Sequence, residues 1–158
     1  MRTYEKVRGA PVFFANNENQ AGYIADIVFS FKEAKIAGYW VHTKRWWSKR
    51  RFLSLNRAVH EPGGTVSAES EACLERAPKE CSRFSDGKKR IFGTLLLNEA
   101  GSVIGLIEDV YYLPETGKIV GYELTEGLFA DLQKGIKVIK PKIPVEIKGR
   151  TFIVRTDL

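Results

Sequence analysis

The stretch GLIEDVYYLPETGKIVGYELTEGLFADLQK, residues 105–134, decides the fold. It opens with an alternating run, Leu106 to Leu113, whose aromatic and β-branched side chains are typical of a half-buried β-strand. Pro114 to Gly117 interrupts the run with residues that favour a tight turn, and Lys118 to Leu124 resumes the alternation. The stretch therefore predicts a β-hairpin. A short helical turn is predicted to follow over Gly127–Leu132, with an apolar face that either joins the core or offers a groove to a partner.

A looser copy of this hairpin occurs earlier in the chain. Residues 22–29, GYIADIVF, match residues 105–112, GLIEDVYY, and residues 35–38, KIAG, match residues 118–121, KIVG. Both matches have the same offset of 83 residues, so the turn between them has one length, and we infer a tandem duplication. A glycine within a strand also suggests close approach of a neighbouring backbone or a bend. The positions that we expect the repeated unit to require for its structure are Gly22, Asp26, Gly38, Gly105, Asp109, Gly117 and Gly121.

Short predicted strands with turn signals every ~8–12 residues favour small barrels or sandwiches. We therefore predict an all-β chain of two tandem barrels: a first repeat over residues 1–68, a linker over 69–90 and a second repeat over 91–158. Within the linker, Glu69 to Arg76 favours a short helix with Ser67 or Ser70 as its cap. Each repeat is near the size at which a single hydrophobic core gives only marginal stability. The two repeats are therefore expected to pack against each other or against a partner.

The positive charge is concentrated in the first repeat. The net charge of the 158 residues is +6, but residues 1–60 carry 11 Lys and Arg against 4 Asp and Glu, whereas residues 91–158 carry 8 against 9. An electrostatic partner surface is therefore expected in the first repeat.

The basic residues are densest over residues 44–51, a segment that is predicted to form the tip of a hairpin. Cations in such a tip contact phosphates, and exposed indoles stack on bases or sit among lipid headgroups. The alternative interpretation is a solvated hairpin whose indole rings fold back and plug the mouth of the barrel. The candidate partner-binding residues are Lys44, Arg45, Trp46, Trp47, Lys49, Arg50 and Arg51.

No catalytic motif is recognisable. The sequence contains no phosphate loop, nucleophile elbow, zinc-protease helix or dinucleotide fingerprint. Asp26 and Asp109 occupy matching positions, which allows a paired acid/base site. A position kept in both copies of a duplication is first a structural requirement, so we favour carboxylates that accept backbone hydrogen bonds and fix a strand bend. We expect no enzyme activity and no cofactor.

Metal binding and membrane insertion are not expected either. Cys73 and Cys81 have no ligand spacing with each other or with His42 and His60, and two thiols do not make a disulfide framework. The first residues lack the apolar segment of a signal peptide, and no run approaches the ~20 apolar residues that span a bilayer. The sequence therefore predicts a cytoplasmic protein with no transmembrane segment.

The motifs of the second repeat resemble a known family. The pattern G-x-I-x-D-V from Gly105, followed by GKIVGYEL from Gly117 and G-x-x-x-D-L-x-x-G from Gly127, is similar to the PRC-barrel domain. That domain is named for the cytoplasmic part of the photosynthetic reaction-centre H subunit, and it also forms the C-terminal domain of a bacterial 16S rRNA-processing and ribosome-maturation factor. The resemblance is closest to a stand-alone tandem form from spore-forming bacteria. It covers about residues 7–68 and 91–156, more loosely in the first repeat, where the tryptophan-containing basic run is inserted.

The resemblance implies an adaptor. Members of the family hold protein, RNA-associated or membrane partners, and no catalytic residues transfer. The membrane helix of the reaction-centre relative and the separate N-terminal domain of the ribosome factor have no counterpart in this sequence. We expect a non-catalytic binding protein that contacts a protein or an anionic partner through its basic first repeat. Two alternatives stay open: an RNA- or ribosome-associated maturation factor, and a structural component of a membrane surface or spore. A homodimer formed by edge pairing is a further expectation.

Overall fold

The structure, a computed structural model, describes residues 1–126, 135–141 and 145–155. Over these residues the chain is mainly β-structure, as predicted. The helical turn predicted over Gly127–Leu132 lies outside the described residues. The described helical elements are single turns: α1 (Tyr4–Val7) and the 3-10 turns η1 (Leu55–Arg57) and η2 (Glu71–Cys73).

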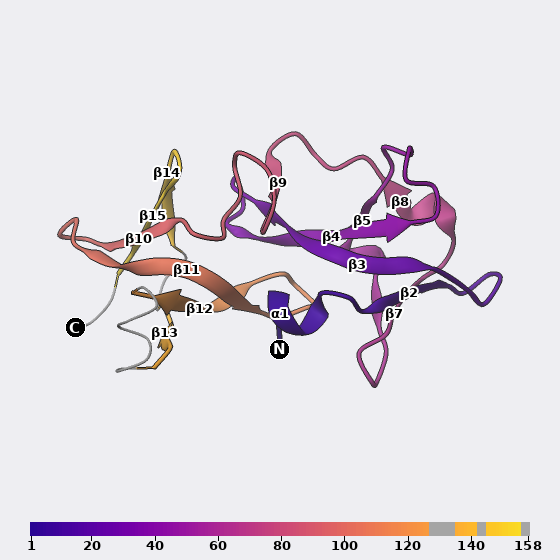
Figure 1. Ribbon diagram of the computed structural model, residues 1–158, viewed down its shortest axis with the longest axis horizontal. Helices are drawn as coiled ribbons and strands as arrows, with labels where there is room; N and C mark the ends of the chain where they lie inside the picture. Colours follow the sequence, from indigo (N-terminus) through magenta and orange to yellow (C-terminus); the bar gives the residue numbers. More distant parts are fainter. Residues whose placement is uncertain (127–134, 142–144, 156–158) are drawn as a thin grey trace.

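The strands form two curled sheets that lie end to end along the long axis of the molecule, with α1 at their junction (Figure 1). The first sheet contains β2 (Pro11–Phe14), β3 (Asn19–Ser30), β4 (Lys35–Thr43), β5 (Phe52–Ser54), β6 (Val59–His60), β7 (Val66–Ala68), β8 (Leu74–Glu75) and β9 (Cys81–Arg83). The second contains β1 (Arg2–Thr3), β10 (Leu95–Asn98), β11 (Val103–Tyr112), β12 (Ile119–Thr125), β13 (Lys137–Ile139), β14 (Glu146–Lys148) and β15 (Thr151–Val154).

The two sheets match strand for strand. The order β6-β7-β2-β3-β4-β5 in the first sheet corresponds to β14-β15-β10-β11-β12-β13 in the second, and β2–β7 and β10–β15 are both parallel pairs. The hairpins also share their register. In β3–β4 the register shifts after Ile24 and Asp26 then pairs with Trp40; in β11–β12 it shifts at the equivalent place and Asp109 pairs with Glu123. Every other pair of β11–β12 recurs in β3–β4 at the offset of 83 residues, including a second shift.

The repeats exchange their leading strands. Arg2 of β1 pairs with Tyr112 of β11 in the second sheet, whereas Ser82 of β9 pairs with Phe29 of β3 in the first. Phe29 and Tyr112 are equivalent under the duplication, so the exchange is reciprocal. β2 pairs only with the first part of β3, and β9 pairs with its last residues, which would otherwise leave unsatisfied backbone groups. β1 does the same for β11.

Because of this exchange, the sheets do not follow the predicted boundaries of the two repeats and the linker. The first strand, within residues 1–68, belongs to the second sheet, and residues 69–90 supply β8 and β9 to the first sheet. The helix predicted over Glu69 to Arg76 shortens to η2, whose cap is Ser70, the Oγ of which accepts a hydrogen bond from the Ala72 amide. Leu74 is buried and pairs with Leu53 of β5, so tertiary packing overrides helix formation there.

One continuous hydrophobic core runs through both sheets. Two contacts at the junction join residues that are equivalent in the two repeats. The rings of Tyr4 and Phe84, each two residues after Arg2 and Ser82, pack with centroids 4.9 Å apart. Lys35 forms a backbone bridge with its own counterpart, Lys118. The repeats are therefore related by a pseudo-two-fold axis that passes through their interface.

Close backbone approach explains some of the shared glycines. A Cβ at Gly22 would lie 1.8 Å from the carbonyl oxygen of His42, and one at Gly38 would lie 2.2 Å from that of Leu53. Gly121 differs from expectation, because a Cβ there would make ordinary contacts of 3.5 Å. It pairs with Tyr111, beside the second register shift of the β11–β12 hairpin.

Candidate functional site

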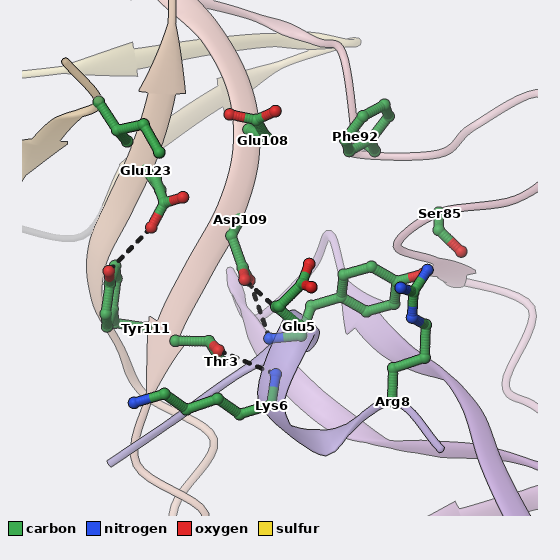
Figure 2. A pocket seen from close by; sticks show the side chains of 12 residues that line it. Thr3, Glu5, Lys6, Arg8, Ser85, Phe92, Glu108, Asp109, Tyr111 and Glu123 are labelled. Atoms are coloured by element: carbon green, nitrogen blue, oxygen red, sulfur yellow. Dashed lines mark hydrogen bonds between the residues drawn. The ribbon is translucent and has the colours of Figure 1, made fainter.

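A pocket of about 610 Å³ lies at the junction of the repeats, between α1, β11 and β12 (Figure 2). Asp109 is among the lining residues and is buried, at 5% exposed. The Asp109 carboxylate accepts hydrogen bonds from the amides of Tyr4 at 2.8 Å, Glu5 at 3.1 Å and Val110 at 2.6 Å. Burial raises the pKa of the Asp109 carboxyl, and these backbone donors oppose the rise. The side chain thus fixes α1 to the second sheet.

Asp26 has the same role in the first sheet. It is fully buried and accepts hydrogen bonds from the Ile27 amide at 2.9 Å and from the Ser85 hydroxyl at 2.7 Å. The Ser85 amide also donates to it, and the Arg83 guanidinium lies 3.2 Å away. Burial again raises the pKa of the carboxyl. The segment that Asp26 anchors is the one that leads into the second repeat, just as Asp109 anchors the segment that leads into the first.

The two aspartates have separate hydrogen-bond partners. Each binds a different backbone segment, and no hydrogen bond joins the two carboxylates in the described chain. Each carboxylate is held in place by several donors, and at Asp109 all three are backbone amides. Another polar contact of the pocket links Tyr111 to Glu123, with the phenol donating at 2.8 Å; this bond raises the pKa of Tyr111.

The tryptophan loop, residues 44–51, connects β4 to β5 as the sequence predicts. The alternative in which its indoles plug the barrel is wrong: Trp46 is 72% exposed and Trp47 is 65% exposed. Their rings pack edge to face, with centroids 5.8 Å apart and planes at 85°. The interior of the first sheet is instead filled by side chains from its own strands, such as Tyr39 and Leu53, which are fully buried.

The cations of the tryptophan loop divide into two groups. Arg51 holds the loop in shape, because its guanidinium donates to the carbonyl of Trp46 and, at 3.1 Å, to that of Ser48. Arg45 pairs with Glu71 at 3.1 Å on the surface. The other three have no acidic partner within 4 Å among residues 1–126, 135–141 and 145–155, and all are exposed: Lys44, Lys49 and Arg50.

Sequence reasoning missed a buried polar chain between the repeats. The phenol oxygens of Tyr39 and Tyr112 are 3.0 Å apart, and that of Tyr39 is also 2.6 Å from Nε2 of His60. Burial raises the pKa of Tyr39 to about 12 and lowers the pKa of His60. No sequence signal identifies this chain, because its members lie on different strands in different repeats. His60 is thus engaged with Tyr39, and within the described residues no three His, Cys, Asp or Glu side chains gather as metal ligands.

These features define a class of protein: an all-β chain of two duplicated, curled sheets whose leading strands are exchanged. The chain belongs to the family of a protein from Bacillus subtilis (strain 168) described as "Uncharacterized protein YrrD". The two are 32% identical over 135 residues, which cover 84% of this chain and 74% of YrrD. No protein-family model matches the chain. In the described part of the structure, no helix has both the length and the apolar character to cross a bilayer.

Proposed function

We propose that this chain is a non-catalytic adaptor of two PRC-like barrels that attaches to an anionic lipid surface through the tryptophan loop. The PRC-barrel assignment is supported by the two curled sheets and by the motif residues that organise them. Gly105 and Asp109 lie in the central strand of the second sheet, and Asp109 fixes the chain that enters the sheet. A cytoplasmic location, at the inner face of a membrane, forms part of this proposal.

The observation that carries the proposal is the exposure of Trp46 and Trp47. Large aromatic side chains are usually more than half buried, and contiguous exposed apolar surface marks an interaction site. Here two adjacent indoles project from one loop, and the loop is held in shape from within by Arg51 and by the bond from the Ser48 amide to the Arg45 carbonyl. A surface prepared in this way loses little conformational entropy when it binds.

The charges around the indoles indicate an anionic partner. Lys44, Lys49 and Arg50 are exposed and unpaired within the described chain, and residues 1–60 carry the whole positive excess. A basic residue near an anionic leaflet contributes about 1 kcal/mol of attraction. Tryptophan prefers the interface between headgroups and hydrocarbon, because its ring is apolar and its N–H is polar.

The geometry of the loop favours a lipid surface over RNA. Single strands bind along grooves in which successive bases stack on aromatic faces. Trp46 and Trp47 stand at 85° to each other at the tip of a hairpin, so they do not offer parallel faces to neighbouring bases. A headgroup layer imposes no such requirement on ring orientation.

The second repeat supplies a surface for a protein partner. Its net charge is close to zero, and Ile136 and Val138 are 58% and 45% exposed. Val138 lies in β13, which together with β14 terminates the described second sheet. An exposed edge strand with apolar side chains accepts an added strand, either from another protein or from a second copy of this chain.

Vesicle co-sedimentation tests the lipid contact. The protein should pellet with vesicles of mixed phosphatidylglycerol and phosphatidylcholine, and much less with phosphatidylcholine alone. Lys49→Glu with Arg50→Glu should weaken this binding at least about tenfold, and Trp46→Ala with Trp47→Ala should weaken it at unchanged charge. Lys32→Glu with Lys79→Glu is the matched control, because it reverses two exposed charges elsewhere and should have a smaller effect.

A parallel mobility-shift assay with a short single-stranded RNA decides between partners. Binding to RNA that the loop variants abolish, without binding to anionic vesicles, would replace the lipid proposal with an RNA-associated role. Equal loss in the loop variants and in the matched control would show that net charge, and not the loop, governs the interaction.

A further inference from the structure

A second cationic site lies away from the tryptophan loop. A pocket of about 500 Å³ opens between residues 87–95 and the turn that joins β14 to β15. Three cations line it: Lys88 and Arg90 from the segment before the second repeat, and Arg150 from the β14–β15 turn. The fold brings these residues together from segments that are far apart in the sequence.

The segment that carries Lys88 and Arg90 is held in a defined shape. Ile91 is fully buried, and the amides of Ile91 and Phe92 both donate to the carbonyl of Phe84, at 3.0 and 2.9 Å. The Arg90 amide donates to the Gly87 carbonyl at 3.3 Å, closing the turn. Because Ile91 anchors the segment in the core, Arg90 and Phe92 on either side of it are kept at the surface.

The position of Arg150 is set by strand pairing. β15 runs parallel to β10, with Phe152 paired to Leu96, so Thr151 is brought beside Leu95 on the wall of the pocket. Arg150 immediately precedes Thr151 in the turn of the β14–β15 hairpin. The pairing of β15 with β10 thus places Arg150 in the same pocket as Lys88 and Arg90.

The charge of this pocket is uncompensated. No acidic side chain lines it, and Lys88, Arg90 and Arg150 make no ion pair with any residue in the described ranges. Two other cations near the pocket do have acidic partners, whereas Lys89, which is exposed and does not line the pocket, has none within the described ranges. Arg83 pairs with Asp26 and Asp86, and Lys148 pairs with Glu146 at 3.3 Å. Convergent, unpaired guanidinium and ammonium groups form strong charge-assisted hydrogen bonds with phosphate oxygens.

An aromatic side chain completes the site. Phe92 lines the pocket and is 42% exposed, and its ring packs against that of Phe84 at 74° with centroids 6.4 Å apart. The contact with Phe84 supports the ring from the core side. Leu95, 47% exposed, adds apolar surface beside it. A planar group that stacks on such a surface is stabilised without a specific hydrogen bond.

We propose that this pocket binds a phosphate ester of the nucleotide class, with its phosphates on Lys88, Arg90 and Arg150 and its base against Phe92. The volume lies within the range of small-ligand sites. The same chemistry is presented by a free nucleotide and by a nucleotide within an RNA strand. No residue of the tryptophan loop lines this pocket. The nucleotide proposal can therefore be tested separately from the proposed lipid contact.

Isothermal titration calorimetry on the full chain tests the site, with ATP, tripolyphosphate and a short single-stranded RNA as ligands. ATP should bind, and Arg90→Ala and Arg150→Ala should each weaken binding about tenfold, the loss expected for one charged hydrogen bond. Phe92→Leu keeps the apolar contact with Phe84 but removes the stacking surface, so it should weaken ATP more than tripolyphosphate. Lys148→Ala, on the same hairpin but outside the pocket, is the matched control and should leave binding unchanged.

Several results would overturn the proposal. They are absence of ATP binding at millimolar concentration, ATP binding unaffected by Arg150→Ala, and equal affinity for ATP and tripolyphosphate, which would remove the base from the site. If RNA binds more tightly than ATP and Arg150→Ala weakens both, the strand is the source of the nucleotide. If ATP binds more tightly than RNA, the source is a free nucleotide.

Discussion

The phenol oxygens of Tyr39 and Tyr112 lie 3.0 Å apart and join the two repeats through a buried hydrogen bond. The duplication does not repeat this contact, because the position equivalent to Tyr112 in the first repeat is Phe29. Tyr39 also contacts His60. Tyr39 is thus the central member of a three-residue chain, and Tyr112 and His60 are its ends.

Removal of the central hydroxyl should cost more than removal of a terminal one. Tyr39→Phe leaves both Tyr112 and His60 without their partner, so we expect it to lower the free energy of unfolding by about 1–3 kcal/mol. Tyr112→Phe leaves the Tyr39–His60 contact in place and should cost about 0.5–1.5 kcal/mol. Urea denaturation of both variants measures the difference. Equal costs, or a larger cost for Tyr112→Phe, would contradict this account of the chain.

The lowered pKa of His60 predicts a pH dependence of stability. Burial disfavours the imidazolium in the folded protein, so the unfolded chain binds more protons between the folded pKa and the ordinary value of 6.5. Stability contributed by neutral His60 is therefore complete above pH 6.5 and declines as the pH falls below it. His60→Gln should lose this part of the decline, as read from urea midpoints over a pH series. His42→Gln, on the exposed face of β4, controls for loss of an imidazole, and should keep the decline.

Replacement of Asp109 should lower the stability of the protein without changing its binding to anionic vesicles. In Asp109→Asn one oxygen becomes an N–H₂ donor that faces a backbone amide, and an unmatched buried donor costs about 1–3 kcal/mol. The melting temperature should fall, while sedimentation with anionic vesicles below that temperature stays unchanged. Loss of vesicle binding in the folded variant would give Asp109 a functional role.

The sequence predicts those parts of the fold that leave a local pattern. Two strands that alternate around a proline–glycine turn predict the β11–β12 hairpin, and the constant offset predicts that β3–β4 shares its register, as the structure confirms. The exchanged strands leave no pattern, because β1 has two residues and β9 has three. Their positions are set by the unpaired ends of β3 and β11, which only the assembled sheets reveal.

The candidate sites divide in the same way. The tryptophan loop is contiguous, so its composition identifies it, but composition leaves open whether the indoles are buried. The structure shows that both indoles are exposed, and that Arg51 donates to the carbonyls of Trp46 and Ser48 within the loop. The pocket lined by Lys88 and Arg150 depends on the parallel pairing of β10 with β15. The distribution of charge along the sequence does not predict that pairing.

Gly117 should be the least replaceable glycine at the interface. Its φ is +77°, and a Cβ there would lie 1.9 Å from the carbonyl oxygen of Ile36, whose amide donates to the Gly117 carbonyl at 2.9 Å across the repeats. Gly117→Ala combines left-handed strain of about 1–2 kcal/mol with separation of the two backbones, so we expect a loss of more than 2 kcal/mol. Gly149→Ala, at φ +64° with open space around it, should show the strain alone. Equal losses in the two variants, measured by urea denaturation, would mean that the contact with Ile36 contributes nothing.

Deletion of residues 1–5 should weaken the second repeat more than the first. These residues supply β1, which pairs with Tyr111 and Tyr112, and the amides of Tyr4 and Glu5 that bind Asp109. The first sheet keeps its own added strand, β9, in the truncated chain. Hydrogen exchange should therefore show faster exchange at residues 109–112 than in the full chain, with little change at the equivalent residues 26–29. If residues 26–29 lose protection first, the leading segment stabilises its own repeat, and the reciprocal exchange of strands does not hold the two sheets together.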